Sequence, residues 1–483
     1  MERSVLTEAL TISRVVTGLW QIADMERDSR DLDPETTAAA MTPYVEAGLT
    51  SFDMADHYGS AEEIAGLFRE RHGSDGELQL LTKWVPPPGT VTRADVRAAV
   101  ERSLERLRVE RLDLLQFHTW TYADPAWLDC LLWLQELKWE GLIGAIGLTN
   151  FDTAHLRVVL ESGIEVVSNQ VCFSLLDQRP AREMIELCLQ RGVKILAYGT
   201  LAGGLLSDRW LGKERPPRAE RTWSQMKYLR FIAEAGGWEV FQHLLGVLDG
   251  VARRLGVTIA NVASRSILEQ RTVAGVIIGA RLGRSEHIRE SLDLFRFSLD
   301  RESRSRIAEA LTLLRPIPGD SGDEYRKPPF LTASGDLSHH VESFPAPFEA
   351  RAGAGGRHVV LTGTRWEELA GFCRAVRLGE RILVSGTTAT HADRVVGGTD
   401  AAAQLHFVVD KIEAVLHSLG GRLEDVIRTR VFVRDLSDWE RVSQAHGARF
   451  REILPTNTLV QASLVGDDYL VEMEAEAVVG EGR

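Results

Sequence analysis

The chain has 483 residues, of which 44% are hydrophobic and 26% are charged, an ordinary composition for a folded protein. At roughly 100 to 200 residues per domain, this length predicts two or three domains. The formal net charge of −13 argues against a nucleic-acid partner, because phosphate neutralisation requires clustered Lys and Arg. Neither a signal-peptide pattern nor an apolar run of roughly 20 residues is present, so we expect a cytoplasmic protein without a membrane partner.

Eight short apolar runs alternate with amphipathic stretches in the first part of the chain. The runs cover residues 15–22, 50–54, 78–84, 112–118, 143–151, 164–171, 193–199 and 274–280. They are nearly continuous in Val, Ile and Leu, as in parallel strands that are covered on both faces. This repeated alternation of strand and helix predicts a (β/α)₈ barrel, an α/β fold. Before the last run, residues 207–223 are expected to form a long loop that shapes a substrate pocket.

The periodicity stops at Arg315. Residues 315–357 are rich in Pro, Gly, Ser and Asp and predict a linker, so the barrel domain is expected to span 1–314. In 358–483, six strand-like runs surround helical stretches at 400–418 and 438–452, which predicts a second, smaller α+β domain. The His and Cys residues show no metal-ligand spacing, and no metal site is expected.

Four polar side chains follow three successive strands of the predicted barrel: Asp53, Tyr58, Lys83 and His118. Catalytic groups converge at the carboxyl ends of barrel strands. A tyrosine with a pKa of ~10 needs a nearby cation to become a better acid, which Lys83 can supply while Asp53 holds the ammonium. His118 can hydrogen-bond a carbonyl oxygen. Each residue alone also fits a packing or surface role, but the set indicates proton donation to a carbonyl group, with a reductant supplied by a cofactor.

Residues 10–312 resemble the aldo/keto reductase superfamily. The resemblance is carried by "FDMADHYGSAE", "LTKW", "QFH", "GLTNF", "SNQ" and "AYGTLAGGLL". It implies an NADP(H)-dependent oxidoreductase that reduces an aldehyde or ketone, or oxidises the alcohol. It also implies a catalytic tetrad of the four residues named above, with Tyr58 as the general acid.

The same resemblance implies a set of cofactor contacts. Thr149, Asn150 and Gln170 correspond to residues that hydrogen-bond the nicotinamide carboxamide, and Tyr198 corresponds to the residue that stacks on the ring. Arg281 corresponds to the residue that faces the 2′-phosphate, where a guanidinium has suitable donor geometry. The other expected contacts are Gly18, Trp20, Gly199, Thr200, Leu201, Gly203, Gly279, His287 and Ser291. His287 and Ser291 stand where relatives often carry Gln and Asn.

Three tryptophans follow strands of the predicted barrel: Trp20, Trp84 and Trp120. We expect them to line a pocket for an apolar or aromatic carbonyl compound.

Residues 358–480 resemble the RidA (YjgF) family, small trimeric proteins that hydrolyse reactive enamines and imines. The resemblance is carried by "RILVSGTTAT", "VIRTRVFVRDLSDWERV", "ILPTNTLVQASLV" and "LVEMEAEAVVG", and it implies a homotrimer. Active members place a carboxylate-binding arginine where this chain has Asn457. Asn457 cannot supply that cation, so imine hydrolysis is not expected. Glu474, or alternatively Glu472, corresponds to the acidic residue that positions water, although an outward-facing strand residue is an equal interpretation.

Three functions remain open at this point. The first is an NADPH-dependent carbonyl reductase fused to a RidA-like domain. The second is a nucleotide-binding sensor or assembly protein, since some relatives are channel subunits or ligand-binding trimers. In the third, the two domains process the same carbonyl or imine, because a short tether raises the local concentration of an intermediate. The intact tetrad favours a reductase.

Overall fold

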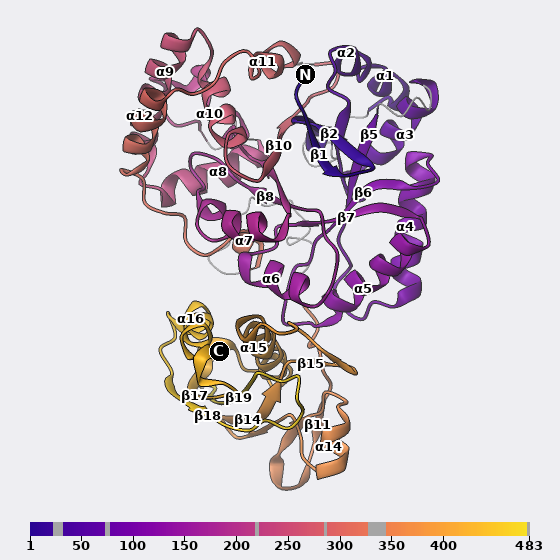
Figure 1. Cartoon of the computed structure of the whole chain (residues 1–483), viewed down its shortest axis with the longest axis vertical. Helices are drawn as coiled ribbons and strands as arrows, with labels where there is room; N and C mark the ends of the chain where they lie inside the picture. Colours follow the sequence, from indigo (N-terminus) through magenta and orange to yellow (C-terminus); the bar gives the residue numbers. More distant parts are fainter. Residues whose placement is uncertain (23–31, 73–77, 218–221, 285–286, 327–343, 481–483) are drawn as a thin grey trace.

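The computed structural model describes residues 1–22, 32–72, 78–217, 222–284, 287–326 and 344–480. The chain forms a larger domain and a smaller one, which lie end to end along the long axis of the molecule (Figure 1). Among the described residues, no helix has both the length and the apolar composition that crossing a membrane requires.

In the described part of the larger domain, eight parallel strands close into a barrel in the order β10-β3-β4-β5-β6-β7-β8-β9. They are β3 (Val15–Gly18), β4 (Ser51–Asp53), β5 (Gln79–Trp84), β6 (Leu112–Phe117), β7 (Ile143–Thr149), β8 (Ser168–Cys172), β9 (Lys194–Tyr198) and β10 (Val273–Gly279). Each strand overlaps one of the eight apolar runs, so the predicted barrel is confirmed.

Strand alternation sorts the barrel side chains into two sets, because successive residues point to opposite faces. The inward set forms an apolar cluster inside the barrel that includes Val16, Leu81, Leu114, Ala145, Leu196 and Ala274. The outward set packs in a larger core against the surrounding helices. The helices around the barrel are α1 (Pro34–Ala39), α2 (Thr42–Glu46), α3 (Ala61–His72), α4 (Arg93–Leu107), α5 (Ala126–Trp139), α6 (Thr153–Glu161), α7 (Met184–Arg191), α10 (Ile259–Leu268), α11 (Ile288–Asp293) and α12 (Arg301–Leu311).

Two features of the barrel domain differ from the sequence-based expectation. A hairpin of β1 (Arg3–Thr7) and β2 (Leu10–Ser13) precedes the barrel, and Leu10 and Ile12 join the inner cluster. In its described part, the predicted loop 207–223 is irregular apart from a 3₁₀ turn at Asp208–Trp210, until α8 begins at its last residue. The helices α8 (Trp223–Glu234) and α9 (Trp238–Leu255), for which no element was predicted, build a second apolar core with α10 and α12. Within the predicted loop 207–223, residues 218–221 lie outside the described residues.

The smaller domain has a mixed sheet in the order β11-β12-β13-β14-β19-β17-β18. Its strands are β11 (Ala350–Ala352), β12 (His358–Val360), β13 (Ala375–Leu378), β14 (Arg381–Thr388), β17 (Val426–Val433), β18 (Thr456–Gln461) and β19 (Val471–Val478). A short hairpin of β15 (Thr390–His391) and β16 (Arg394–Val395) and a short helix α14 (Arg365–Ala370) complete it. The helix α15 (Ala401–Ser418) lies against β14 and β19 of the sheet, and α16 (Trp439–Phe450) packs on α15.

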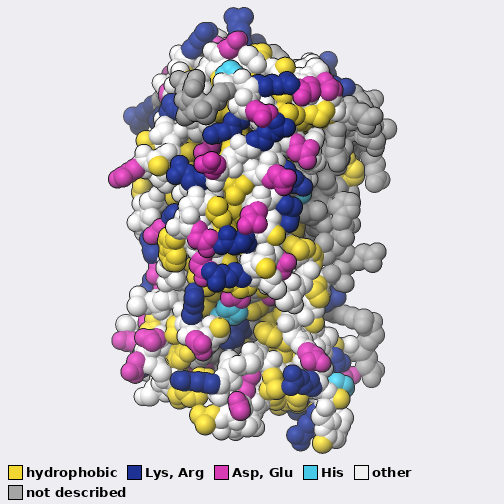
Figure 2. All heavy atoms as spheres, turned by 90° about the vertical axis from the view of Figure 1, so that its right-hand side faces the viewer, with side chains coloured by type: hydrophobic (Ala, Val, Ile, Leu, Met, Phe, Trp, Pro, Cys, Tyr) yellow, Lys and Arg dark blue, Asp and Glu magenta, His cyan; other side chains and the backbone are white. Residues whose placement is uncertain are grey.

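The segment predicted as a linker, 315–357, is partly structured. It contains α13 (Asp323–Arg326) and β11, and β11 pairs with β12 of the smaller domain. Residues 327–343 of this segment lie outside the described residues. On the face shown in Figure 2, acidic and basic side chains are intermixed over both domains.

Candidate active site

The carboxyl ends of the barrel strands carry a row of inward-facing residues. Lys83 lies two residues after Leu81 and Tyr198 two residues after Leu196, and both leucines belong to the cluster inside the barrel. By the same alternation, Thr149 shares the inward side of β7 with Ala145. The strand register sets Gly18 beside Asp53 and Thr149 beside Gln170. The residues predicted from the sequence therefore meet at one end of the barrel.

Lys83 occupies the centre of the predicted tetrad. Its Nζ donates to Oδ2 of Asp53 at 2.6 Å and to the carbonyl oxygen of Met54 at 2.8 Å. The same Nζ lies 5.2 Å from the centre of the Tyr58 ring. Oδ1 of Asp53 accepts from Nε2 of Gln170 at 2.7 Å, so the carboxylate is fixed while it holds the ammonium.

Burial dominates the protonation of the tyrosine and the lysine. Desolvation raises the pKa of Tyr58 well above its usual value, and the Asp53 carboxylate raises it further. Desolvation lowers the pKa of Lys83, which the nearby Asp53 carboxylate opposes. The phenol is consequently a protonated donor at neutral pH. The cation that lowers its pKa is Lys227 rather than the expected Lys83, and it does not outweigh the effect of burial.

His118 follows β6 and is buried at the same end of the barrel. Its Nε2 has no hydrogen-bond partner among the described residues. Burial lowers the pKa of His118 well below its usual value, and the Arg326 guanidinium adds to this. A neutral imidazole with an unsatisfied buried nitrogen, close enough to Lys83 to feel its charge, can hydrogen-bond a carbonyl oxygen.

The residues expected to bind the carboxamide form a polar group next to Tyr198. Within the described part of the chain, the hydroxyl of Thr149 is buried without a hydrogen-bond partner. Asn150 has a positive φ of 57°, and its Oδ1 accepts from the Tyr198 hydroxyl at 2.8 Å. Gln170 lies opposite Thr149 on the neighbouring strand. An unsatisfied hydroxyl among amide groups beside an aromatic ring fits a planar amide ligand such as nicotinamide.

At two glycines near this end, a Cβ would collide with a neighbouring side chain. A Cβ on Gly199 would lie 2.2 Å from the Tyr228 hydroxyl, and Gly199 has φ of 76°. A Cβ on Gly279 would lie 2.4 Å from the Gln21 amide. The space beside these two glycines, after β9 and β10, is therefore filled by the Tyr228 and Gln21 side chains. The neighbouring expected contacts are Thr200, Leu201 and Gly203. The Thr200 hydroxyl lies 3.2 Å from the Ser264 hydroxyl.

At the expected adenine end, the three candidate residues differ in exposure. Arg281 lies two residues after β10 and is exposed, and His287 is exposed at the start of α11. Ser291 is buried inside α11. Arg281 and His287 are therefore available to a ligand, whereas the Ser291 hydroxyl lies in the packed layer.

The tryptophans separate into different environments. The Trp20 ring lies 4.9 Å from the Tyr58 ring, and the Trp120 ring lies 4.5 Å from the His118 ring. Trp84 follows the inward-facing Lys83 and therefore points outward, where it packs against Phe117. Trp20 and Trp120 adjoin the tetrad, and Trp84 belongs to the outer core.

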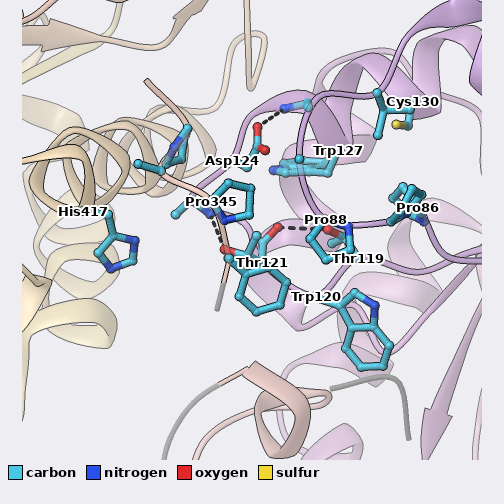
Figure 3. A pocket seen from close by; sticks show the side chains of 18 residues that line it. Pro86, Pro88, Thr119, Trp120, Thr121, Asp124, Trp127, Cys130, Pro345 and His417 are labelled. Atoms are coloured by element: carbon cyan, nitrogen blue, oxygen red, sulfur yellow. Dashed lines mark hydrogen bonds between the residues drawn. The ribbon is translucent and has the colours of Figure 1, made fainter. Parts of the chain in front are cut away.

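Trp120 also borders a cavity of about 150 Å³ between the two domains (Figure 3). The figure shows rings and prolines from both domains around it, with His417 of α15 on one side. The lining includes Pro86, Pro88, Trp120, Trp127, Pro345 and His417. None of the four tetrad residues lines this cavity, so Trp120 divides it from the catalytic groups.

A segment at 317–326, interpreted as linker from its composition, adds side chains to the barrel mouth. Nζ of Lys227 on α8 donates to the Tyr325 hydroxyl at 2.8 Å, and the Tyr325 ring lies 5.7 Å from the His118 ring. The buried Glu324 forms salt bridges with Arg179 at 2.8 Å and with Lys227 at 3.5 Å. No periodic pattern or motif in the sequence indicates these contacts, because they join four separate parts of the chain.

In the smaller domain, the two predicted cleft residues lie on opposite sides of the sheet. Asn457 pairs with the buried Thr429, whose hydroxyl donates to Oδ1 of Asn457 at 3.1 Å. Glu474 pairs with Arg430, the next residue of β17, which points the other way. Glu472 shares the face of Glu474, and its carboxylate lies close to Gly386. Within one chain, the structure does not bring Asn457 and Glu474 together.

Comparison with known proteins identifies the larger domain. Residues 14–312, more than half of the chain, match the Aldo/keto reductase family. The chain belongs to the aldo/keto reductase family. This aldo/keto reductase is 27% identical over 338 residues to the NADH-specific methylglyoxal reductase of Escherichia coli K12, which covers 63% of this chain and 97% of the relative. It is 28% identical over 288 residues to Protein tas of the same organism, and this match covers 51% of this chain and 81% of that relative.

Solved structures agree with the barrel fold of this aldo/keto reductase. The glycerol dehydrogenase of Gluconobacter oxydans aligns with a TM-score of 0.53 and 22% identity, over 66% of this chain and 97% of that one. Residues 362–479 match a second family, Endoribonuclease L-PSP. A YjgF/YER057c/UK114 family member from Mycobacterium tuberculosis is 38% identical over 26% of this chain and 99% of its own, with a TM-score of 0.24.

Proposed function

We propose that this aldo/keto reductase reduces a small aldehyde or ketone with NADPH, and that Tyr58 is the general acid. The observation that carries the proposal is the contact geometry of the tetrad. Lys83 is held by Asp53 at 2.6 Å beneath the Tyr58 ring, beside a neutral His118 whose Nε2 has no partner in the described structure. An assembly or sensor role does not require such a group of buried proton donors.

The roles of the four residues follow from their protonation states. His118 orients the substrate carbonyl by a hydrogen bond to its oxygen. The Tyr58 phenol donates its proton to that oxygen as negative charge develops there. The Lys83 ammonium stabilises the resulting phenolate, and Asp53 keeps the ammonium in place. A bound nicotinamide cofactor supplies the hydride for this chemistry.

The proposed preference for NADPH rests on the exposed Arg281 after β10. A guanidinium recognises the 2′-phosphate through charged hydrogen bonds, which NADH does not offer. The E. coli relative is named as NADH-specific, so a protein similar to this chain can prefer the other cofactor.

Thr149, Asn150 and Gln170 are the proposed carboxamide ligands. Tyr198 is the proposed stacking ring, and Trp20 and Trp120 are the proposed walls of the carbonyl pocket.

For residues 358–483, we propose an assembly role as a homotrimer rather than a second reaction. Asn457 is engaged with Thr429 and carries no positive charge for a substrate carboxylate. The proposed domains are 1–314 and 358–483, and the proposed location is the cytoplasm, without a nucleic-acid partner.

The test compares the purified protein with Tyr58→Phe and with Tyr469→Phe, a matched tyrosine change in the smaller domain. A panel of aldehydes and ketones, including methylglyoxal, is mixed with NADPH and followed by absorbance. Loss of the general acid should reduce turnover about 10²- to 10⁴-fold without loss of NADPH binding, whereas Tyr469→Phe should match the wild type. Turnover above a tenth of the wild-type rate in Tyr58→Phe would contradict the assigned role.

A further inference from the structure

The two domains meet through buried charged groups on α6 and α15, which lie side by side at the junction (Figure 1). Nε2 of His155 on α6 lies 2.9 Å from Oδ2 of Asp410 on α15. His155 is 3% exposed and Asp410 is 1% exposed. The backbone N–H of Gly397 also donates across the junction to Oγ of Ser162 at 3.0 Å.

His155 bridges two carboxylates. Its Nδ1 lies 2.7 Å from Oδ1 of Asp152, and its Nε2 faces Asp410. Because an ionised carboxylate only accepts hydrogen bonds, both ring nitrogens must carry protons, and the ring is an imidazolium. Burial lowers the pKa of His155, but the carboxylates of Asp152 and Asp410 outweigh it and raise the pKa overall.

Asp410 is fixed from its other side by Arg449 of α16. Nη1 of Arg449 donates to Oδ1 of Asp410 at 2.6 Å, while Nη2 donates to Glu413 at 2.9 Å. The result is an unbroken charged chain from Asp152 through His155 and Asp410 to Arg449. Removing a middle member of such a buried chain breaks one charge pairing on each side of it, so its members hold one another in place.

The barrel end of this chain lies next to the proposed carboxamide site. Asp152 caps α6 by accepting from the backbone N–H of His155 at 2.7 Å, and it lies two residues after Asn150. Asn150 has the left-handed φ of 57°, so its orientation depends on how the following turn is held. Nη1 of Arg326 donates to the Asn150 carbonyl at 2.7 Å from the opposite side.

We infer that Asp410 of the second domain is a positioning residue for the nicotinamide site of the barrel, acting through His155 and Asp152 on Asn150. The second domain then supports the cofactor site from outside it, and Asp410 touches neither cofactor nor substrate. Coupling between two sites is reciprocal, so cofactor binding must also stabilise the contact of α15 with α6. This inference rests on the proposed function, in which Asn150 binds the carboxamide.

The first experiment measures the dissociation constant of NADPH by fluorescence titration of the whole protein. Asp410→Asn keeps the size of the side chain but removes the charge that His155 requires. We expect about 5- to 150-fold weaker NADPH binding, with turnover at saturating NADPH unchanged. Ser162→Ala removes a different contact across the junction and should change the constant less than twofold. A constant within twofold of the wild type in Asp410→Asn overturns the inference.

The second experiment needs no variant, so it decides the question even if Asp410→Asn fails to fold. Hydrogen exchange of α15 is measured in the wild type with and without NADPH. Slower exchange around Asp410 on NADPH binding is the expected result, and unchanged exchange overturns the inference.

Asn150→Ala distinguishes failure of the proposed function from failure of the coupling. If this variant binds NADPH like the wild type, the proposed carboxamide role fails. If it binds weakly while Asp410→Asn binds normally, only the coupling fails.

Discussion

Tyr58 and His118 lie in the same site, and burial moves their pKa values in opposite directions. The pKa of Tyr58 is raised and that of His118 is lowered, because in both cases the charged form is disfavoured. At neutral pH the site therefore holds a protonated phenol and an uncharged imidazole. This pairing suits carbonyl reduction, since the proton donor is fully loaded before the substrate arrives.

The proposed cofactor preference depends on a single exposed side chain. Replacing Arg281 by Ala should weaken NADPH binding roughly ten- to a hundred-fold, because a hydrogen bond to a charged group contributes ~1.5 to 3 kcal/mol. NADH binding should remain as it is, since NADH lacks the 2′-phosphate. Fluorescence titration with both nucleotides gives the ratio of dissociation constants. An unchanged ratio in Arg281→Ala would place the preference elsewhere.

Lys411 of α15 predicts a pH dependence of stability. Its Nζ donates to the Thr390 carbonyl at 2.6 Å, and burial together with the nearby Arg374 lowers its pKa to about 7. In the unfolded chain the pKa is ~10.4, so between pH 7 and 10 the unfolded state binds more protons. The free energy of unfolding should consequently rise with pH in this window, by up to about 1.4 kcal/mol per pH unit from this group.

Lys411→Met removes this titration and should lose the rise in stability between pH 7 and 10. Unfolding midpoints at pH 7, 8, 9 and 10 measure the effect relative to the wild type. Lys213→Met, at an exposed lysine, is the control and should follow the wild-type pH profile. Parallel profiles for Lys411→Met and the wild type would show that the buried amine does not titrate in this range.

At the level of elements, the segment 317–326 closes the barrel mouth through charged anchors. Its buried Glu324 faces the cations of Arg179 and Lys227, which lower the pKa of Glu324 against the effect of burial. Glu324→Ala leaves both cations without this carboxylate and should cost ~3 to 5 kcal/mol of unfolding free energy. Chemical denaturation measures this loss. The exposed Glu309→Ala on α12 should change stability by no more than about 0.5 kcal/mol, and equal losses for both variants would refute the anchoring role.

The barrel strands and the helices of the second domain were predictable because each leaves a periodic apolar pattern. The helices α8 and α9 were missed, since the Pro- and Arg-rich stretch before them reads as a loop. The segment 317–326 was interpreted as a linker from its Pro, Gly and Asp content. Its structure depends on Arg179, Arg182 and Asn150, which are distant in the sequence and leave no local signal.

For the site, strand alternation was the most informative rule. It places Lys83 inside the barrel and by the same reasoning places Trp84 outside, so the outward position of Trp84 was available from the sequence. The separation of Asn457 from Glu474 was not available from the sequence, because it depends on how β18 and β19 pair with β17. The contact of His155 with Asp410 joins residues from two domains, and neither residue belongs to a motif.

At the scale of the whole molecule, the barrel and the sheet of the second domain occupy different sides of α15. This helix contacts α6 of the barrel and also packs on β14 and β19. Side chains on the other face of the sheet remain exposed in the described chain, among them Leu383 at 46% and Val460 at 42%. In the proposed homotrimer, three copies of the chain associate through this face of the sheet while the barrels lie on the outside.

The proposed homotrimer predicts a mass of three times 53.6 kDa in solution. Val460→Glu puts a charge on the exposed face of the edge strand β18 and should convert the trimer to a monomer, because burying a charge that has no partner costs several kcal/mol. Val465→Glu, at a 68% exposed position beyond that strand, should remain trimeric. Sedimentation velocity distinguishes the two. A monomeric wild type would contradict the assembly role.

The last prediction separates the shape of the second domain from its chemistry. Asn457 has no positive charge, its Oδ1 accepts from Thr429, and in the same chain it faces away from Glu474. A substrate carboxylate thus lacks the cation that fixes it, and the proposed trimer should not accelerate the decay of 2-iminopropionate above the rate in buffer. An imine-decay assay on the whole protein measures this, with Asn457→Arg as the matched variant. Imine hydrolysis in Asn457→Arg alone would show that only the cation is missing, whereas rapid hydrolysis by the wild type would show that another residue binds the carboxylate and that the protein has two activities.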